Sequence, residues 1–129
     1  MYSHPGNRPR FISIKEFRFP INALLSAAHR ITGFALIVSL LAYIGLTNLI
    51  LLNDSVSLAD VTSCKLVLLL HTGFWIALSY HWLSGLRHLL AEHFIEPKLY
   101  EMINSKGVSF ALITVWIFAS ITIAYQVWS

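Results

Sequence analysis

Residues 31–53 read ITGFALIVSLLAYIGLTNLILLN and contain no Asp, Glu, Lys or Arg. Two further uncharged stretches follow, of 21 residues at 66–86 and of 23 residues at 107–129. An α-helix rises about 1.5 Å per residue, so about 20 apolar residues cross the hydrocarbon core of a bilayer. The sequence therefore predicts an all-α fold with three transmembrane helices. We expect them at about 21–52, 62–93 and 108–128.

The composition also indicates a membrane protein. Of the 129 residues, 57% are hydrophobic and 12% are charged, which is too apolar for an ordinary soluble domain. The length predicts one membrane-anchor domain over 1–129. The net charge of +3 gives no indication of a nucleic acid partner, and we expect none. Cys64 is the only cysteine of the sequence, which excludes an internal disulfide and a thiolate metal site.

The placement of basic residues predicts an orientation. Eight of the nine Lys and Arg residues lie before the first span or between the second and third, namely Arg8, Arg10, Lys15, Arg18, Arg30, Arg87, Lys98 and Lys106. Lys- and Arg-rich segments stay in the cytoplasm, so we expect a cytoplasmic N-terminus and a periplasmic C-terminus in a bacterial inner membrane. Residues 11–19 mix apolar and charged side chains, which favours a short segment in the cytoplasmic interface. Residues 94–107 are expected to form a cytoplasmic loop.

A first polar cluster lies at the beginning of the first span. Ser26, His29, Arg30 and Gly33 stand at i, i+3, i+4 and i+7, on one face of a helix. Ionisable groups near membrane depth are costly and usually mark a functional site. The Arg30 guanidinium can bind a carbonyl oxygen or a carboxylate, and Ser26 adds a neutral donor and acceptor. The alternative is that Arg30 reaches the lipid headgroups and Ser26 bonds its own backbone.

A second polar cluster lies at the end of the second span. His81, Ser84, Gly85 and His88 again stand at i, i+3, i+4 and i+7. His81 lies six residues, or about 9 Å, inside Arg87. An imidazole there can serve as an axial ligand of haem iron, and Gly85 would leave room for a flat macrocycle. The alternative is a histidine that is hydrogen-bonded to a hydroxyl of a neighbouring helix.

Further basic side chains lie near the membrane level of His81, and one further histidine lies elsewhere in the same span. Four residues at the same membrane level could receive haem propionates, namely His29, Arg30, Arg87 and His88. His71 lies about 15 Å from His81 toward the opposite membrane face, too far to bind the same iron. We expect His71 to form a structural hydrogen bond to another helix.

These residues resemble the large cytochrome b membrane-anchor subunit of succinate dehydrogenase (succinate:quinone oxidoreductase), over almost the whole chain. The first family motif begins with Arg-Pro and ends in Ser-x-x-His-Arg-x-Ser/Thr, which Arg8-Pro9 and residues 26–32 match. The second is His-x-x-x-Gly-φ-Arg-His, which residues 81–88 match. Two positions depart from the family. Arg10 replaces an aliphatic residue, and Ala91-Glu92 stands where an aromatic residue or Met usually precedes Asp.

The resemblance implies roles for these residues. His81 looks like one axial ligand of a low-spin b haem, and a histidine of a smaller partner anchor subunit would be the other. Ser26 and Arg30 look like ubiquinone-site residues. The anchor would also dock an iron–sulfur subunit and a flavoprotein subunit, which oxidise succinate, and would hold no residue of that catalysis itself. The alternatives are the anchor of a quinol:fumarate reductase and a haem-free membrane scaffold.

Overall fold

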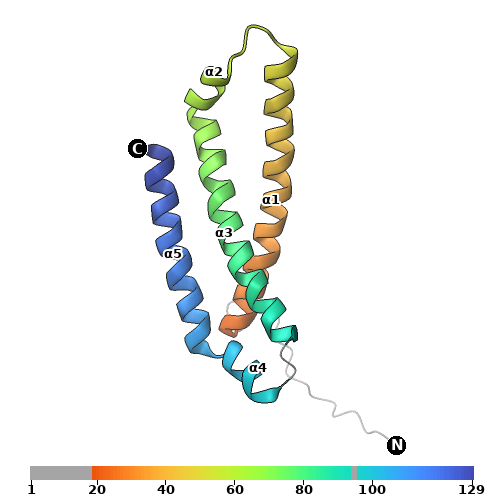
Figure 1. Ribbon diagram of the computed structural model, residues 1–129, viewed down its shortest axis with the longest axis vertical. Coiled ribbons are helices and arrows are strands. Elements are labelled where there is room, and N and C mark those ends of the chain that lie inside the picture. The colour runs from red at the N-terminus through yellow and green to blue at the C-terminus, as the bar shows by residue number, and fades with distance from the viewer. Residues whose placement is uncertain (1–18, 94–95) are drawn as a thin grey trace, which may run out of the picture.

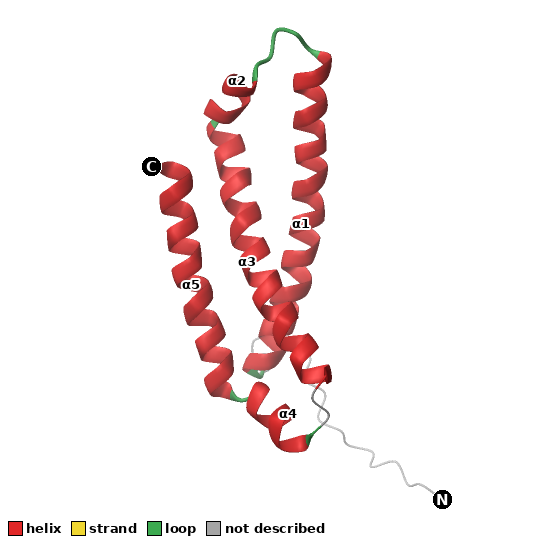
Figure 2. Cartoon of the chain, viewed as in Figure 1, coloured by secondary structure: helices red, strands yellow, loops and turns green. Residues whose placement is uncertain are grey.

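The structure is a computed structural model that describes residues 19–93 and 96–129. This part of the chain is helical and contains no strand, which confirms the predicted all-α fold (Figure 2). Its helices are α1 (Ile21–Leu52), α2 (Leu58–Ser63), α3 (Lys65–His93), α4 (Pro97–Ile103) and α5 (Lys106–Trp128). By length and composition α1, α3 and α5 can each cross a membrane. The predicted interfacial segment at 11–19 lies outside the described residues except for Phe19.

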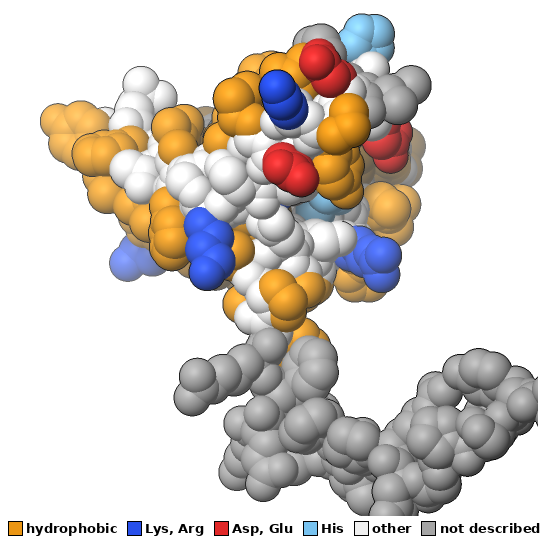
Figure 3. Space-filling model, turned by 90° about the horizontal axis from the view of Figure 1, so that it is seen from below, with side chains coloured by type: hydrophobic (Ala, Val, Ile, Leu, Met, Phe, Trp, Pro, Cys, Tyr) orange, Lys and Arg blue, Asp and Glu red, His pale blue; other side chains and the backbone are white. Residues whose placement is uncertain are grey.

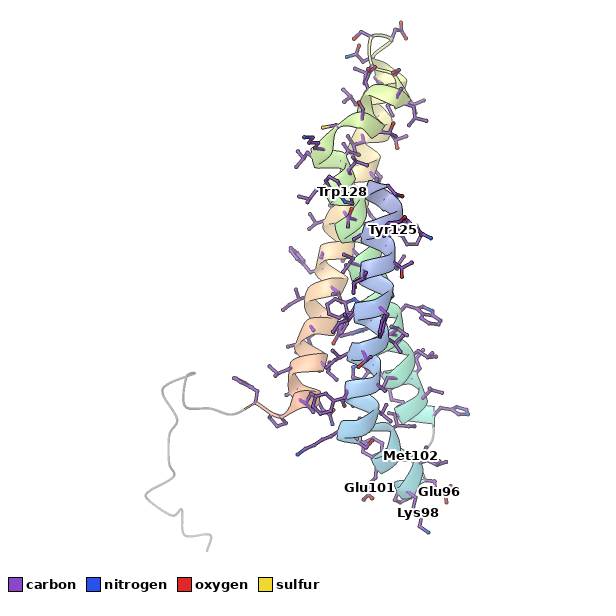
Figure 4. The ribbon with its side chains drawn as sticks, turned by 90° about the vertical axis from the view of Figure 1, so that its left-hand side faces the viewer. Glu96, Lys98, Glu101, Met102, Tyr125 and Trp128 are labelled. Atoms are coloured by element: carbon purple, nitrogen blue, oxygen red, sulfur yellow. The ribbon has the colours of Figure 1, made fainter. Side chains whose placement is uncertain are left out.

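The three long helices lie side by side, with α3 between α1 and α5 (Figure 1). The beginning of α1, the end of α3 and the short helix α4 share one end of the bundle, while α2 and the end of α5 lie toward the other. Tyr125 and Trp128 are at the latter end, and the exposed Glu96, Lys98 and Glu101 are at the α4 end (Figure 4). The two polar clusters of the sequence therefore meet at the α4 end.

The connection between the first two long helices contains a short helix that the sequence did not predict. The second span was expected from residue 62, but α3 begins at Lys65 because α2 occupies Leu58–Ser63. A capping box starts α2, since Ser57 Oγ accepts from Asp60 N and the Asp60 carboxylate accepts from Ser57 N at 2.9 Å. The hydrogen bonds from Ser57 hold the pKa of the Asp60 carboxyl below its usual value.

The prediction of a loop at 94–107 is wrong in part, because α4 lies within it. Pro97 stands in the first turn of α4, where its missing N–H is not needed by the helix. The next helix, α5, begins at Lys106, two residues before the predicted position, and Ser105 Oγ caps it by accepting from Val108 N.

Tryptophan side chains join α5 to α3 along their length. The Trp116 indole N–H donates to the Ile76 carbonyl oxygen at 3.1 Å. The Trp128 indole N–H donates to Thr72 Oγ1 at 2.9 Å. Lipid tails are as apolar as the helices, so such bonds and close packing hold membrane helices together. Several of the buried side chains are small and polar, and Ser84 and Ser109 are the most buried of the described residues.

Candidate functional site

Three histidines from the two polar clusters meet between α1 and α3. The imidazole rings of His29 and His81 are stacked, with centroids 4.0 Å apart and an interplanar angle of 11°. The His88 ring meets the His29 ring edge-on at 5.4 Å. The sequence predicted only that these residues share a membrane level, and the structure places them in contact.

The hydrogen bond of His81 fixes the state of its ring. Its Nδ1 lies 3.1 Å from the main-chain oxygen of His29 and 3.4 Å from Oγ1 of Thr32. A carbonyl oxygen only accepts, so Nδ1 carries the proton, and in the neutral ring Nε2 keeps its lone pair. Histidines that bind metals almost always donate their other ring N–H in this way. The expected alternative, a bond to a hydroxyl of another helix, is also present at Thr32, but it involves Nδ1 and leaves Nε2 available.

Two glycines leave room for the stacked rings, Gly33 beside His81 and Gly85 beside His29. A Cβ at Gly33 would stand 3.0 Å from Cε1 of His81, closer than nine in ten real Cβ contacts. A Cβ at Gly85 would stand 3.4 Å from Cε1 of His29. On the outer side of α3 a groove of about 240 Å³ is lined by His81, Trp82, Gly85, Leu86 and Leu89. All of its lining residues come from this one helix.

Ser26 and Arg30 keep unused hydrogen-bonding groups. Arg30 is exposed, and it forms no hydrogen bond or ion pair within the part of the chain that the structure describes. The Ser26 hydroxyl likewise has no partner among the described residues, whereas Thr32 and Ser39 donate to carbonyl oxygens one turn earlier. The structure therefore leaves the donors of Ser26 and Arg30 available to a ligand.

Arg87 does not line the histidine groove. It is 6% exposed, and its guanidinium donates from Nε to the Ile103 carbonyl and from Nη2 to Oδ1 of both Asn22 and Asn104. Ser109 Oγ donates to the same Asn22 oxygen. The contacts of Asn22, Asn104 and Ser109 were not predicted from the sequence. The Asn22 amide, which lies shortly before the first uncharged stretch, could have indicated such a contact. An unpaired amide is costly near lipid and therefore needs a hydrogen-bond partner.

The predicted hydrogen bond of His71 to another helix is present in the structure. The Trp75 indole N–H donates to Nε2 of His71 at 3.0 Å, so Nδ1 carries the proton of the neutral ring. Nδ1 in turn lies 2.7 Å from the Tyr43 hydroxyl oxygen on α1, to which it donates. Both nitrogens of His71 are thus occupied, and the bond to Tyr43 joins α3 to α1 in the half of the bundle away from His81.

The sequence of this chain matches a known protein family. Residues 5–124 match the family model of the succinate dehydrogenase/fumarate reductase transmembrane subunit. A succinate dehydrogenase cytochrome b556 subunit of Coxiella burnetii is 35% identical, over 65% of this chain and 70% of the relative. A protein of the same name from Paracoccus denitrificans is 36% identical, over 65% of this chain and 66% of the relative. The chain therefore belongs to the family of transmembrane cytochrome b subunits of succinate dehydrogenase and fumarate reductase, as the sequence motifs indicated.

Proposed function

We propose that this chain is the haem b-binding membrane anchor of a succinate dehydrogenase and forms part of the site at which ubiquinone is reduced. One observation carries the haem assignment: the Nδ1–H of His81 is held by the carbonyl of His29, and Nε2 is left with a lone pair. The names of the two relatives, both cytochrome b556 subunits, support it. The bound group would supply one-electron transfer.

The residues around His81 fit a haem. His81 would provide one axial ligand, and Gly85 lines the groove beside it without a side chain. The Nδ1 atom of His29 is buried with no hydrogen-bond partner among the described residues, so a polar group arriving here would satisfy it. Arg30 and His88 are exposed and could bind propionates.

A second subunit would complete this site. Since one helix alone lines the groove, its opposite wall and the second axial histidine would come from a smaller anchor subunit. The α4 end of the molecule bears both basic and acidic side chains (Figure 3). This end would face the cytoplasm, where the iron–sulfur and flavoprotein subunits would dock and deliver the electrons of succinate.

Ser26 and Arg30 would form this chain's part of the quinone pocket. They lie four residues apart on α1, so they stand about 6 Å apart along the helix axis. Arg30 would donate to a quinone carbonyl oxygen and stabilise the negative charge that develops during reduction, as preorganised donors do in an oxyanion hole. Ser26 would add a neutral hydrogen bond. Neither donor has a competing partner in the described part of the chain.

The quinone assignment is tested with Arg30→Leu and Ser26→Ala in the complete complex in membranes. Arg30→Leu should lower succinate–ubiquinone activity at least about tenfold, since a hydrogen bond from a charged donor contributes roughly 1.5–3 kcal/mol. Reduction of an artificial acceptor by the soluble subunits should stay normal. Lys98→Gln removes an exposed charge on α4 and serves as the control. Normal ubiquinone turnover in both variants would remove the quinone site from α1.

The two alternatives are separated by different measurements. The family also includes fumarate reductase anchors, which would hold the same groups and run the reaction in the opposite direction. The ratio of succinate oxidation to fumarate reduction in the purified complex decides between these directions. A haem-free scaffold would give no b-type bands in a dithionite-reduced minus oxidised spectrum of the wild-type complex, and such a spectrum would overturn the haem assignment.

A further inference from the structure

Arg87 is the only buried charged side chain among residues 19–93 and 96–129. A buried charge is costly unless it is well hydrogen-bonded. Within the described residues the guanidinium has no carboxylate partner, and oxygen atoms of uncharged groups surround it. These hydrogen bonds to fixed oxygen atoms indicate that Arg87 has a specific structural role.

The contacts of Arg87 join α3 to the end of α4. Its Nε donates to the carbonyl of Ile103, the last residue of α4, at 3.2 Å. Its Nη2 donates to Oδ1 of Asn104, the C-cap of α4, at 3.1 Å. The last carbonyl groups of a helix have no partner within it, and they favour a cation. Arg87 therefore satisfies the end of α4 from α3.

The same guanidinium reaches α1 through Asn22. Nη2 of Arg87 is 2.9 Å from Oδ1 of Asn22, which also accepts from Ser109 Oγ of α5 at 2.8 Å. The Asn22 amide donates to the Asn104 carbonyl at 2.8 Å. One side chain in the first turn of α1 thus contacts α3, α5 and the residue after α4. The N-cap residue, Pro20, makes no side-chain hydrogen bond, so these tertiary contacts hold the first turn instead.

A second bond supports the same segment of α1. The hydroxyl of the buried Tyr80 on α3 donates to the Leu25 carbonyl at 2.9 Å. Leu25 is itself buried and directly precedes Ser26. The segment of α1 that leads into Ser26 is therefore fixed against α3 at two points, Asn22 and Leu25.

We propose that the Arg87–Asn22 pair is a clamp that positions the beginning of α1 and, through it, the quinone-binding side chains Ser26 and Arg30. These side chains follow Asn22 by four and eight residues, about 6 and 12 Å along the same helix. The inference rests on the quinone site proposed above. It makes Arg87 a positioning residue of that site and replaces its predicted role as a partner of the haem propionates.

A double-mutant cycle in the complete membrane-bound complex tests the clamp. The variants are Asn22→Ala, Arg87→Gln and the double variant, and the measurements are KM and kcat for ubiquinone, artificial-acceptor activity and the haem midpoint potential. Each single variant should raise the KM for ubiquinone about fivefold or more, with artificial-acceptor activity and haem potential unchanged. The double variant should be no worse than the more affected single variant, because both remove the same contact. Arg87→Lys should recover part of the loss, since Lys keeps the charge without the planar fork.

Matched controls separate the clamp from general effects. Asn48→Ala removes an exposed asparagine from the same helix, and Lys98→Gln removes an exposed charge. Both should have the wild-type KM. If Arg87→Gln does not assemble, Asn22→Ala and Arg87→Lys carry the test, and an Asn22→Ala complex with the KM of Asn48→Ala overturns the clamp.

Other outcomes also contradict the clamp. Additive effects of the two substitutions would show that Asn22 and Arg87 act independently. A changed haem potential in Arg87→Gln with a normal Asn22→Ala would return Arg87 to the haem. If Arg30→Leu loses ubiquinone turnover while the clamp variants keep the wild-type KM, the clamp alone is wrong. If Arg30→Leu and Ser26→Ala both keep normal turnover, the proposed quinone site is wrong and the positioning role falls with it.

Discussion

The imidazole ring of His81 lies against the main chain of Gly33, so that a Cβ at position 33 would stand 3.0 Å from Cε1 of the histidine. The ring has little freedom to retreat. Its Nδ1 is bonded to the His29 carbonyl and its face is stacked on the His29 ring. Because Gly33 on α1 has no side chain, the predicted haem ligand His81 on α3 can occupy this position.

Gly33→Ala should therefore disturb the haem without changing the ligand. The added methyl group displaces the His81 ring by a few tenths of an ångström and weakens its bond to His29. Loss of such supporting contacts typically costs about 10- to 100-fold in metal affinity, so we expect lower haem occupancy after purification. Gly45→Ala is the control, because a Cβ at Gly45 meets nothing within 4 Å. Equal haem content in the two variants would contradict the close contact at Gly33.

Tyr43→Phe should reduce stability while leaving the haem spectrum unchanged. The substitution removes the acceptor of the His71 Nδ1–H, and interhelical hydrogen bonds of this kind in membranes contribute about 0.6 to 1.7 kcal/mol. The expected result is a lower thermal unfolding midpoint of the purified complex. Tyr125→Phe removes an exposed hydroxyl with no partner in the described part of the chain and should leave the midpoint unchanged. An altered haem spectrum in Tyr43→Phe would connect His71 to the haem after all.

The distribution of basic residues predicts the orientation in the membrane. A reporter inserted near Tyr100 should be cytoplasmic, and a reporter fused after Ser129 should be periplasmic. Alkaline phosphatase and green fluorescent protein fusions distinguish the two compartments. The reverse pattern would place both polar clusters, and with them the proposed quinone pocket, at the periplasmic face.

The sequence predicted the long helices well because uncharged length is a direct requirement of the bilayer. The predicted bounds of α1, 21–52, coincide with those of the structure. The short helices α2 and α4 were missed for a different reason. They contain six and seven residues, and helices of this length depend on local caps and tertiary contacts more than on any hydrophobic pattern.

The site was predictable to the level of its motifs and no further. Helical spacing placed His29 and His81 on defined faces, but their stacking depends on how α1 and α3 pack. The same limit explains Arg87. Its neighbours in sequence suggested the haem, whereas the side chain turns to Asn22 and Asn104, which lie far from it in the chain. Only the tertiary fold reveals such partners.

The most direct test of the proposed function is the reduced minus oxidised spectrum of the complex carrying His81→Ala, compared with that of His71→Ala. Loss of the low-spin b-type bands, or their conversion to a high-spin form, is the result we predict for His81→Ala. His71→Ala should keep a near-normal spectrum, because both ring nitrogens of His71 are engaged in structural bonds. An unchanged low-spin spectrum in a folded His81→Ala complex would contradict the assignment of His81 as a haem ligand.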